Sequence, residues 1–126
     1  MRAPRGVPPG ARSAPYAKRA RKRAMIVGIS VFELHLPTSR SLKDKRRVVK
    51  SLIDRVHQRY RVSIAETDFH DLHQRAEIAM AVVVAGGESE MEKLMDEVRN
   101  IVESDPEVYL TRWDPQLLEG LEEGEP

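Results

Sequence analysis

Hydrophobic and polar residues alternate from Met25 to Leu36, and this two-residue period predicts a β-strand. Shorter apolar stretches predict further strands over 62–66, 75–85 and 108–113. Apolar residues at helical spacing predict a helix from the N-cap Ser41 to about Arg59. A second helix is predicted from the N-cap Ser89 to the Asp105–Pro106 step, because proline restricts the residue before it.

The resulting order is strand, helix, strand, strand, helix, strand. With right-handed crossovers, this order predicts an α+β, ferredoxin-like βαββαβ fold: a four-stranded antiparallel sheet with two helices on one face. A chain of 126 residues suits a single domain. We predict a disordered basic tail at 1–24, the ferredoxin-like domain at 25–113 and a frayed acidic C-terminus at 114–126.

The alternation also predicts what lies on the other face of the sheet. If one set of strand residues packs against the helices, a second set points away from them: Val27, Ile29, Val31, Ala79, Ala81 and Val83. This second set is too apolar to be left wholly in water. Another copy of the same chain is the simplest covering partner, so we expect self-association through this face.

Charge is distributed unevenly along the chain, although its net charge is only +1. Residues 1–23 carry eight Lys or Arg and no acid, whereas residues 114–126 carry five acids and no Lys or Arg. The tail has two interpretations, a basic arm that grips nucleic acid or a mis-assigned start upstream of Met25. We favour the second, because the periodic part of the sequence begins at Met25.

Composition argues against several functional classes. The chain has no cysteine, and no apolar run approaches the roughly 18 residues of a membrane span. The N-terminus lacks the apolar stretch of a secretory signal, so we expect a cytoplasmic protein. No glycine-rich phosphate loop or recognisable nucleophile occurs. We therefore predict no enzyme, no catalytic residues and no cofactor.

The first predicted helix carries the best functional lead. Nine basic residues and two acids lie between Arg40 and Arg61. At 100° per residue, four of the nine share one face and form the candidate nucleic-acid-binding site: Lys43, Arg46, Arg47 and Lys50. Lys45 points instead towards the apolar stripe. The helix N-terminus beside the four cations also favours anions. The competing interpretation is a solvated face that balances the second helix, where residues 88–103 hold six acids and two bases.

The loop after the second strand contains residue types that can bind metals, including His70 and His73. An H-x-x-H spacing alone is weak evidence, because a metal site needs converging ligands with supporting contacts. We interpret the loop as a polar turn between two strands and predict no metal site. For Trp113, at the end of the last predicted strand, we favour edge packing over a role as an interface anchor.

Three segments resemble the YlxP-like family, a bacterial family of unknown function: 25–55, 61–83 and 104–108. Their motifs LHLP, SLKDKR, VSIAE, DL-x-QRA and SDPEV fall in the family's order and spacing. The resemblance implies a single ferredoxin-like domain that begins near Met25. Genes of the family often lie among genes for translation initiation and ribosome maturation, which implies an RNA- or ribosome-associated role. The family commonly has an aromatic residue, often Trp, where this chain has His73, which argues against a shared metal site.

We therefore predict a small accessory protein that associates with RNA or ribosomal particles through its basic first helix. The alternative is a homodimeric protein-interaction module that binds no nucleic acid. A third option, a regulatory domain that binds a small effector, rests on fold analogy alone.

Overall fold

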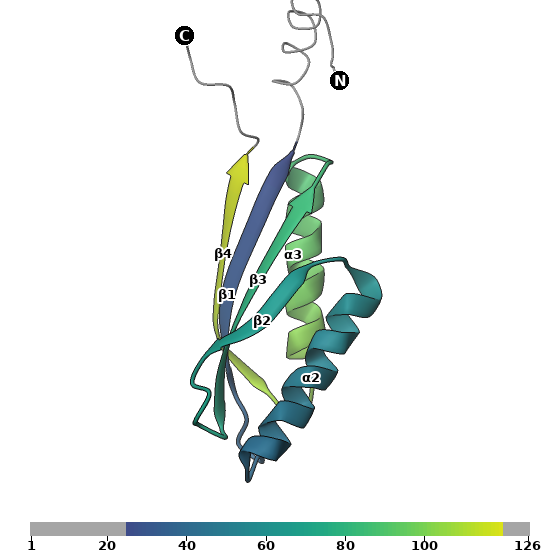
Figure 1. Ribbon diagram of the computed structural model, residues 1–126. Coiled ribbons are helices and arrows are strands. Elements are labelled where there is room, and N and C mark those ends of the chain that lie inside the picture. Colours follow the sequence, from purple (N-terminus) through teal and green to yellow (C-terminus); the bar gives the residue numbers. More distant parts are fainter. Residues whose placement is uncertain (1–24, 120–126) are drawn as a thin grey trace, which may run out of the picture.

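The computed structural model describes residues 25–119 of the chain (Figure 1). Four strands and two helices follow in the predicted order: β1 (Ile26–His35), α2 (Leu42–Arg59), β2 (Ser63–Asp68), β3 (Arg75–Val84), α3 (Glu88–Glu103) and β4 (Tyr109–Glu119). Neither helix of this described part is long and apolar enough to cross a membrane.

The strands form one antiparallel sheet in the spatial order β2-β3-β1-β4. The long strands β1 and β3 occupy its centre, and β2 and β4 are its edges. Both helices lie on the same side of the sheet (Figure 1). This arrangement confirms the predicted ferredoxin-like α+β fold.

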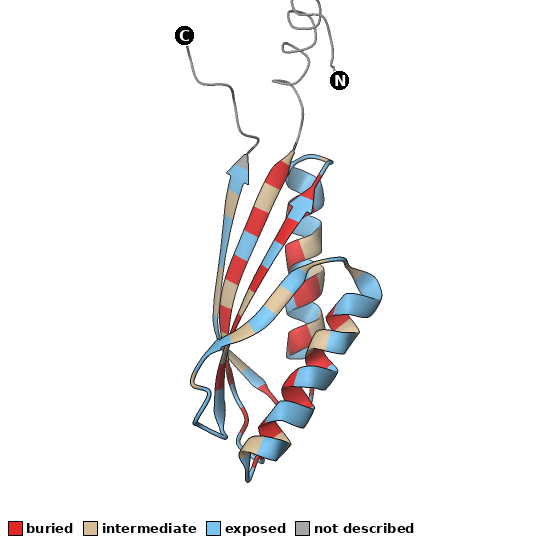
Figure 2. Ribbon diagram, viewed as in Figure 1, coloured by how far each residue is buried: buried red, intermediate tan, exposed pale blue. Residues whose placement is uncertain are grey.

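The core lies between the sheet and the helices. Every second residue of β1 and β3 is buried, and α2 and α3 each present one buried stripe, as the colouring of Figure 2 shows. Phe32, Leu34 and Ile78 of the sheet pack with Val49 and Leu52 of α2. This pattern follows from the spacing of apolar residues in the sequence, which repeats every two residues in the strands and every 3.6 residues in the helices.

Gly28 lets α3 approach the sheet closely. A Cβ atom at this position would lie 2.6 Å from both Met91 Sδ and Met95 Cε. Since Met91 and Met95 are buried, they occupy the space that a side chain on β1 would otherwise fill. A glycine in a strand interior often marks such a close approach.

The helix starts show one confirmed and one wrong prediction. Ser41 is the N-cap of α2, and its Oγ accepts a 3.0 Å hydrogen bond from the backbone N–H of Asp44. Helix α3 begins at Glu88, with Gly87 as an N-cap that has no side chain to donate or accept. Ser89 is therefore already inside the helix, and the predicted capping role is wrong.

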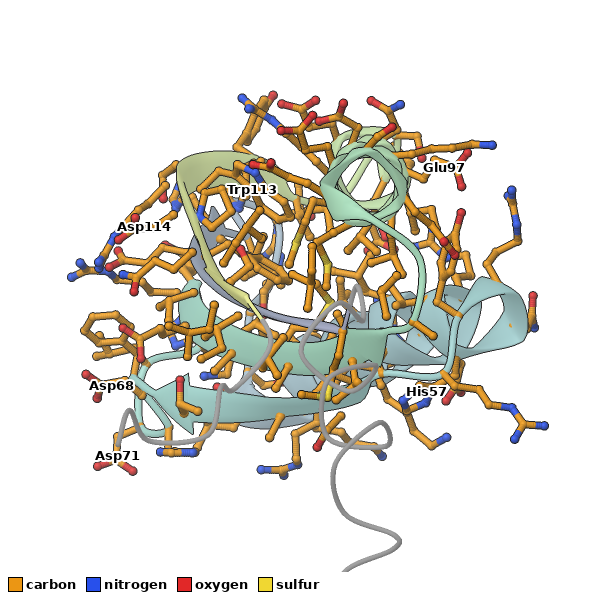
Figure 3. All side chains as sticks on the ribbon, turned by 90° about the horizontal axis from the view of Figure 1, so that it is seen from above. His57, Asp68, Asp71, Glu97, Trp113 and Asp114 are labelled. Atoms are coloured by element: carbon orange, nitrogen blue, oxygen red, sulfur yellow. The ribbon has the colours of Figure 1, made fainter. Side chains whose placement is uncertain are left out.

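The last strand is longer than predicted. We expected 114–126 to be frayed, but β4 pairs with β1 up to Glu119, so that prediction is wrong for 114–119. Trp113 points towards α3 and Asp114 to the opposite side of the strand (Figure 3). Pro115 pairs with Ser30 in the middle of this edge strand, where proline is tolerated. The predicted basic tail at 1–24 and residues 120–126 lie outside the described residues.

Candidate nucleic-acid interface

A buried lysine fixes the N-terminal half of α2 against the sheet. Lys45 is 1% exposed, and its Nζ lies 2.8 Å from Glu66 Oε2 on β2. The same ammonium donates hydrogen bonds to the carbonyl oxygens of Phe69 (2.8 Å) and Arg75 (3.1 Å) in the β2–β3 hairpin. The ammonium thus makes two hydrogen bonds and one close ion pair, in which Glu66 Oε2 has no well-aligned donor. The inward direction of Lys45 agrees with the helical spacing, but its partners lie too far away in sequence to be predicted.

The four candidate residues lie on the outer side of α2, and all four are exposed. We call Lys43, Arg46, Arg47 and Lys50 the basic face. Arg47 lies 3.2 Å from Glu107 Oε1, and Lys50 lies 3.0 Å from Asp54 Oδ2. Within residues 25–119, no carboxylate lies at ion-pair distance from Lys43 or Arg46. The structure therefore leaves two of the four cations without an acidic partner in its described part.

The two ion pairs of the basic face are formed in solvent. Their side chains are 62% and 42% exposed in the Arg47–Glu107 pair and 77% and 54% exposed in the Lys50–Asp54 pair. Hydrogen bonding to Glu107 raises the pKa of Arg47, so its guanidinium stays charged. Solvent-exposed ion pairs in general contribute about 0–1 kcal/mol to protein stability. A stronger anion can therefore replace either carboxylate at little cost.

The side of α2 that borders α3 and the following loop is more completely paired. Arg55 forms an ion pair with Asp105, which is only 7% exposed, and Arg59 lies 4.0 Å from Glu97 on α3. Asp105 also accepts a 2.8 Å hydrogen bond from the backbone N–H of Glu107. The SDPEV motif thus supplies two acids that contact α2. Sequence reasoning missed both roles, because the pairs join residues 50 and 60 positions apart.

The N-terminus of α2 contributes less to anion binding than the sequence suggested. Ser41 accepts the N–H of Asp44, and the carboxylate of Asp44 accepts a 2.9 Å hydrogen bond from the N–H of Arg40. The first turn therefore already holds a negative charge, which offsets the positive end of the helix dipole. Attraction for an anion on this helix must come from the side chains of the basic face.

The His-containing loop forms part of an open hollow at the end of the sheet. The hollow measures about 340 Å³ and is lined by His35, Asp71, Leu72, His73, Gln74 and Arg75. No group of three or more metal-ligating side chains converges anywhere in residues 25–119.

Gln74, from the DL-x-QRA motif, ties this end of the sheet together. Its side-chain amide donates to the carbonyl oxygens of Pro37 and Ser39, both at 3.2 Å. The backbone carbonyl oxygen of Gln74 accepts a 2.9 Å hydrogen bond from the backbone N–H of Leu36. These contacts join the loop after β1 to the start of β3, which gives the motif a structural role.

Comparison with known proteins finds matches to the part of the chain that carries the motifs. A family model described as a protein of unknown function (DUF503) matches residues 27–114. The uncharacterized protein YlxP of Bacillus subtilis is 31% identical over 86 residues, which cover 68% of this chain and 92% of YlxP. The family match includes β1 from Val27 onwards, the basic face and the SDPEV segment.

Proposed function

Because this chain belongs to the DUF503 family of proteins of unknown function, as its YlxP-like motifs predicted, we propose a function from the chemistry of its surface. The protein binds RNA through phosphate contacts made by the basic face of α2. It acts as an accessory factor of ribosomal particles in the cytoplasm, as a binding protein and not as an enzyme.

The observation that carries this proposal is the state of Lys43 and Arg46. Both side chains are exposed, and neither has an acidic partner within the described residues. Cations of this kind release bound counterions from a polyanion when they contact its phosphates, which drives association. Arginine adds bidentate hydrogen bonding to a phosphate, which lysine cannot supply.

The dimensions of the basic face suit a nucleic-acid backbone. Lys43 and Lys50 are seven residues apart, which at about 1.5 Å per residue places them roughly 10 Å apart along the helix. This length lets the basic face reach more than one phosphate of a strand. Arg47 and Lys50 join the contact by exchanging their exposed carboxylate partners for phosphate oxygens.

The same surface supports recognition of the backbone over recognition of sequence. Helix α2 has no Phe, Tyr or Trp on which a base could stack. Specific reading of RNA usually needs stacked, splayed bases and hydrogen bonds to their edges. We therefore expect binding that depends strongly on salt and weakly on sequence.

Charge on the second helix favours a defined orientation on such a partner. Helix α3 contains six acids and two bases and lies on the same side of the sheet as α2. A polyanion attracts the α2 side of the molecule and repels the α3 side. The separation of charge within the helix layer therefore favours contact through α2.

The proposal is tested with a double charge reversal on the basic face, Lys43→Glu with Arg46→Glu. The matched control is Lys93→Glu with Arg99→Glu, which reverses one lysine and one arginine on exposed positions of α3. RNA affinity is measured by fluorescence anisotropy with a structured RNA at several salt concentrations. Loss of two phosphate contacts should flatten the slope of log K against log salt by about 1.5 to 2.

Co-sedimentation with purified ribosomal particles provides the second measurement. The double reversal should abolish co-sedimentation at physiological salt, and reversal of all four residues of the basic face should do so even at low salt. The control on α3 should sediment with the particles at least as well as the unmodified chain. Equal binding by the unmodified chain and the quadruple variant would refute the proposal.

A nuclease-treated pull-down distinguishes the alternative function. RNA binding predicts that partners captured from a lysate disappear after nuclease treatment. A homodimeric protein-interaction module predicts partners that persist, with an acidic protein bound to the basic face. Persistence of every partner would favour that second function over RNA binding.

A further inference from the structure

The sheet face that points away from the helices is the second distinctive surface of the molecule. Strand pairing sets its residues in rows: Val27 opposite Val83, Ile29 opposite Ala81 and Val31 opposite Ala79. On β4, Leu118 extends the first row beside Val27. We call these seven residues the open face. The predicted outward set is thus confirmed as one contiguous apolar surface.

Exposed hydrophobic side chains are concentrated on this side of the sheet. Within the described residues, the exposed large hydrophobic side chains are Ile29 (37%), Leu72 (46%), Val83 (65%), Tyr109 (62%) and Leu118 (57%). Ile29, Val83 and Leu118 belong to the open face, and Tyr109 stacks on His35 at its far end. Only Leu72 lies elsewhere, in the β2–β3 hairpin. Contiguous exposure of this kind marks an interaction surface.

A row of charges borders the open face, and most of these charges are paired within the chain. Glu33 on β1 lies 3.1 Å from Arg75 on β3 and 3.2 Å from Arg112 on β4. Arg112 also pairs with Asp114 at 3.0 Å. The hydrogen bond from Arg75, reinforced by that from Arg112, lowers the pKa of Glu33 despite the opposing effect of burial. Glu77, opposite Glu33 on β3, has no cation at ion-pair distance within the described residues, so the border is neutralised only in part.

We propose that the open face binds a second copy of this chain. The sizes of its side chains support self-complementarity. Strand β1 presents the larger residues Val27, Ile29 and Val31, whereas its neighbour β3 presents alanine at the two positions facing Ile29 and Val31. A two-fold axis that runs along the strands between β1 and β3 sets the larger residues of each copy on the alanines of the other. Such packing keeps the two sheets within the usual angle of about 30°.

The area of the sheet is adequate for this contact. Strand β1 has ten residues, or about 33 Å, and four strands about 4.8 Å apart span roughly 19 Å. The whole sheet face then measures roughly 600 Å², so contact over its full extent buries about 1,200 Å² in two copies, the lower end of specific interfaces. The charged row at one end forms the polar rim that such interfaces usually have.

This arrangement leaves the basic face of α2 accessible. The helices cover the opposite side of the sheet, so a dimer through the open face carries one basic face on each outer surface (Figure 1). Self-association and RNA binding therefore use separate surfaces. The two proposals can fail independently.

The experiment is sedimentation equilibrium of the full chain over a wide concentration range, with Ile29→Lys and Val83→Lys as variants. Each variant buries two lysines in the proposed dimer, one from each copy, and should weaken dimerisation by more than about 100-fold. Leu72→Lys is the matched control, because it replaces an exposed hydrophobic residue outside the open face. Circular dichroism verifies that each variant remains folded.

Disulfide trapping tests the proposed packing directly, since the chain has no cysteine of its own. A mixture of the single variants Ile29→Cys and Ala81→Cys should form a mixed disulfide dimer faster than either variant forms its own. A mixture in which Leu72→Cys replaces either variant should not form a mixed disulfide dimer at this rate. A full chain that stays monomeric throughout, or a dimer that both lysine variants leave intact, would overturn the proposal.

Discussion

Lys45 and Lys43 lie two residues apart on α2, yet they occupy opposite environments. Lys45 is 1% exposed and is bound by Glu66 and two backbone carbonyls of the β2–β3 hairpin. Lys43 points into solvent and has no acidic partner within residues 25–119. The first lysine maintains the position of the helix, and the second leaves its charge available to another molecule.

The comparison shows why a count of basic residues overstates the charge that a helix can offer. Lys45, Arg55 and Arg59 all have acids from other elements beside them. Their charges are used within the chain. Arg47 on the outer side also lies beside an acid of another element, Glu107, but that pair is exposed to solvent and can be exchanged. The 100° step between residues separates the outer cations from the other three.

The largest expected effect on stability is at Lys45. Lys45→Met keeps the aliphatic chain but leaves Glu66 and two carbonyl groups without their cation, and should lower the free energy of unfolding by about 3 kcal/mol. We take the lower end of the usual range because Glu66 retains 17% exposure. Urea unfolding measures the change, with Lys43→Met as the control, which should stay within about 0.5 kcal/mol. Equal stability of the two variants would contradict the proposed difference.

A smaller effect is expected at Asp105, where the acid is buried but its partner is not. Asp105→Asn keeps an acceptor for the N–H of Glu107 but weakens the pair with Arg55, which is 37% exposed. We expect a loss of about 1 to 2 kcal/mol in the same urea assay. Lys50→Gln, which breaks the exposed pair with Asp54, should cost less than about 0.5 kcal/mol. If Lys50→Gln lowered the free energy of unfolding more than Asp105→Asn, burial would not determine how much each ion pair stabilises the protein.

The pH dependence of stability tests whether the ion pairs of Glu33 stabilise the fold. Its pKa is lowered below the ordinary value of 4.5, mainly by the hydrogen bond from Arg75, so its stabilising contribution is complete above that value. The contribution disappears as the pH falls through the lowered pKa. Thermal melts should therefore show the unmodified chain more stable than Glu33→Gln at neutral pH, with the gap closing in acid. A gap that stays constant from neutral pH to about pH 3 would exclude this linkage.

The smallest expected change in stability accompanies the largest expected change in binding. Lys43→Glu with Arg46→Glu should alter the free energy of unfolding by no more than about 0.5 kcal/mol, since neither side chain has an acidic partner in the described structure. The same variant should lose RNA affinity. If it unfolds easily, the outer side of α2 has a structural role and the contrast with Lys45 is lost.

Periodicity accounts for most of the fold. The bounds of α2, its cap at Ser41 and the alternation along β1 and β3 all follow from local patterns in the sequence. The sequence predicts too short a last strand, because the acidic composition of 114–126 favours a frayed end. In the structure, Asp114, Pro115 and Gln116 pair with β1, and this long-range pairing outweighs their weak strand preference.

The candidate site was predictable only in part. Helical spacing placed Lys43, Arg46, Arg47 and Lys50 together and turned Lys45 inwards, and the structure has both features. The acid that pairs with Arg47 was not predictable, because Glu107 lies 60 residues away. Such pairs depend on how the loop after α3 packs on α2, and a single sequence carries no direct signal of that contact.

Pro115 has a consequence for how copies of this protein can stack. It lies near the middle of β4, whose outer side has no neighbouring strand within the described structure. Proline has no N–H, so a ladder of hydrogen bonds that grew from this edge would lack a rung where it needs one. Continuous fibril-like growth is therefore discouraged along β4, even though the sheet face beside it is apolar.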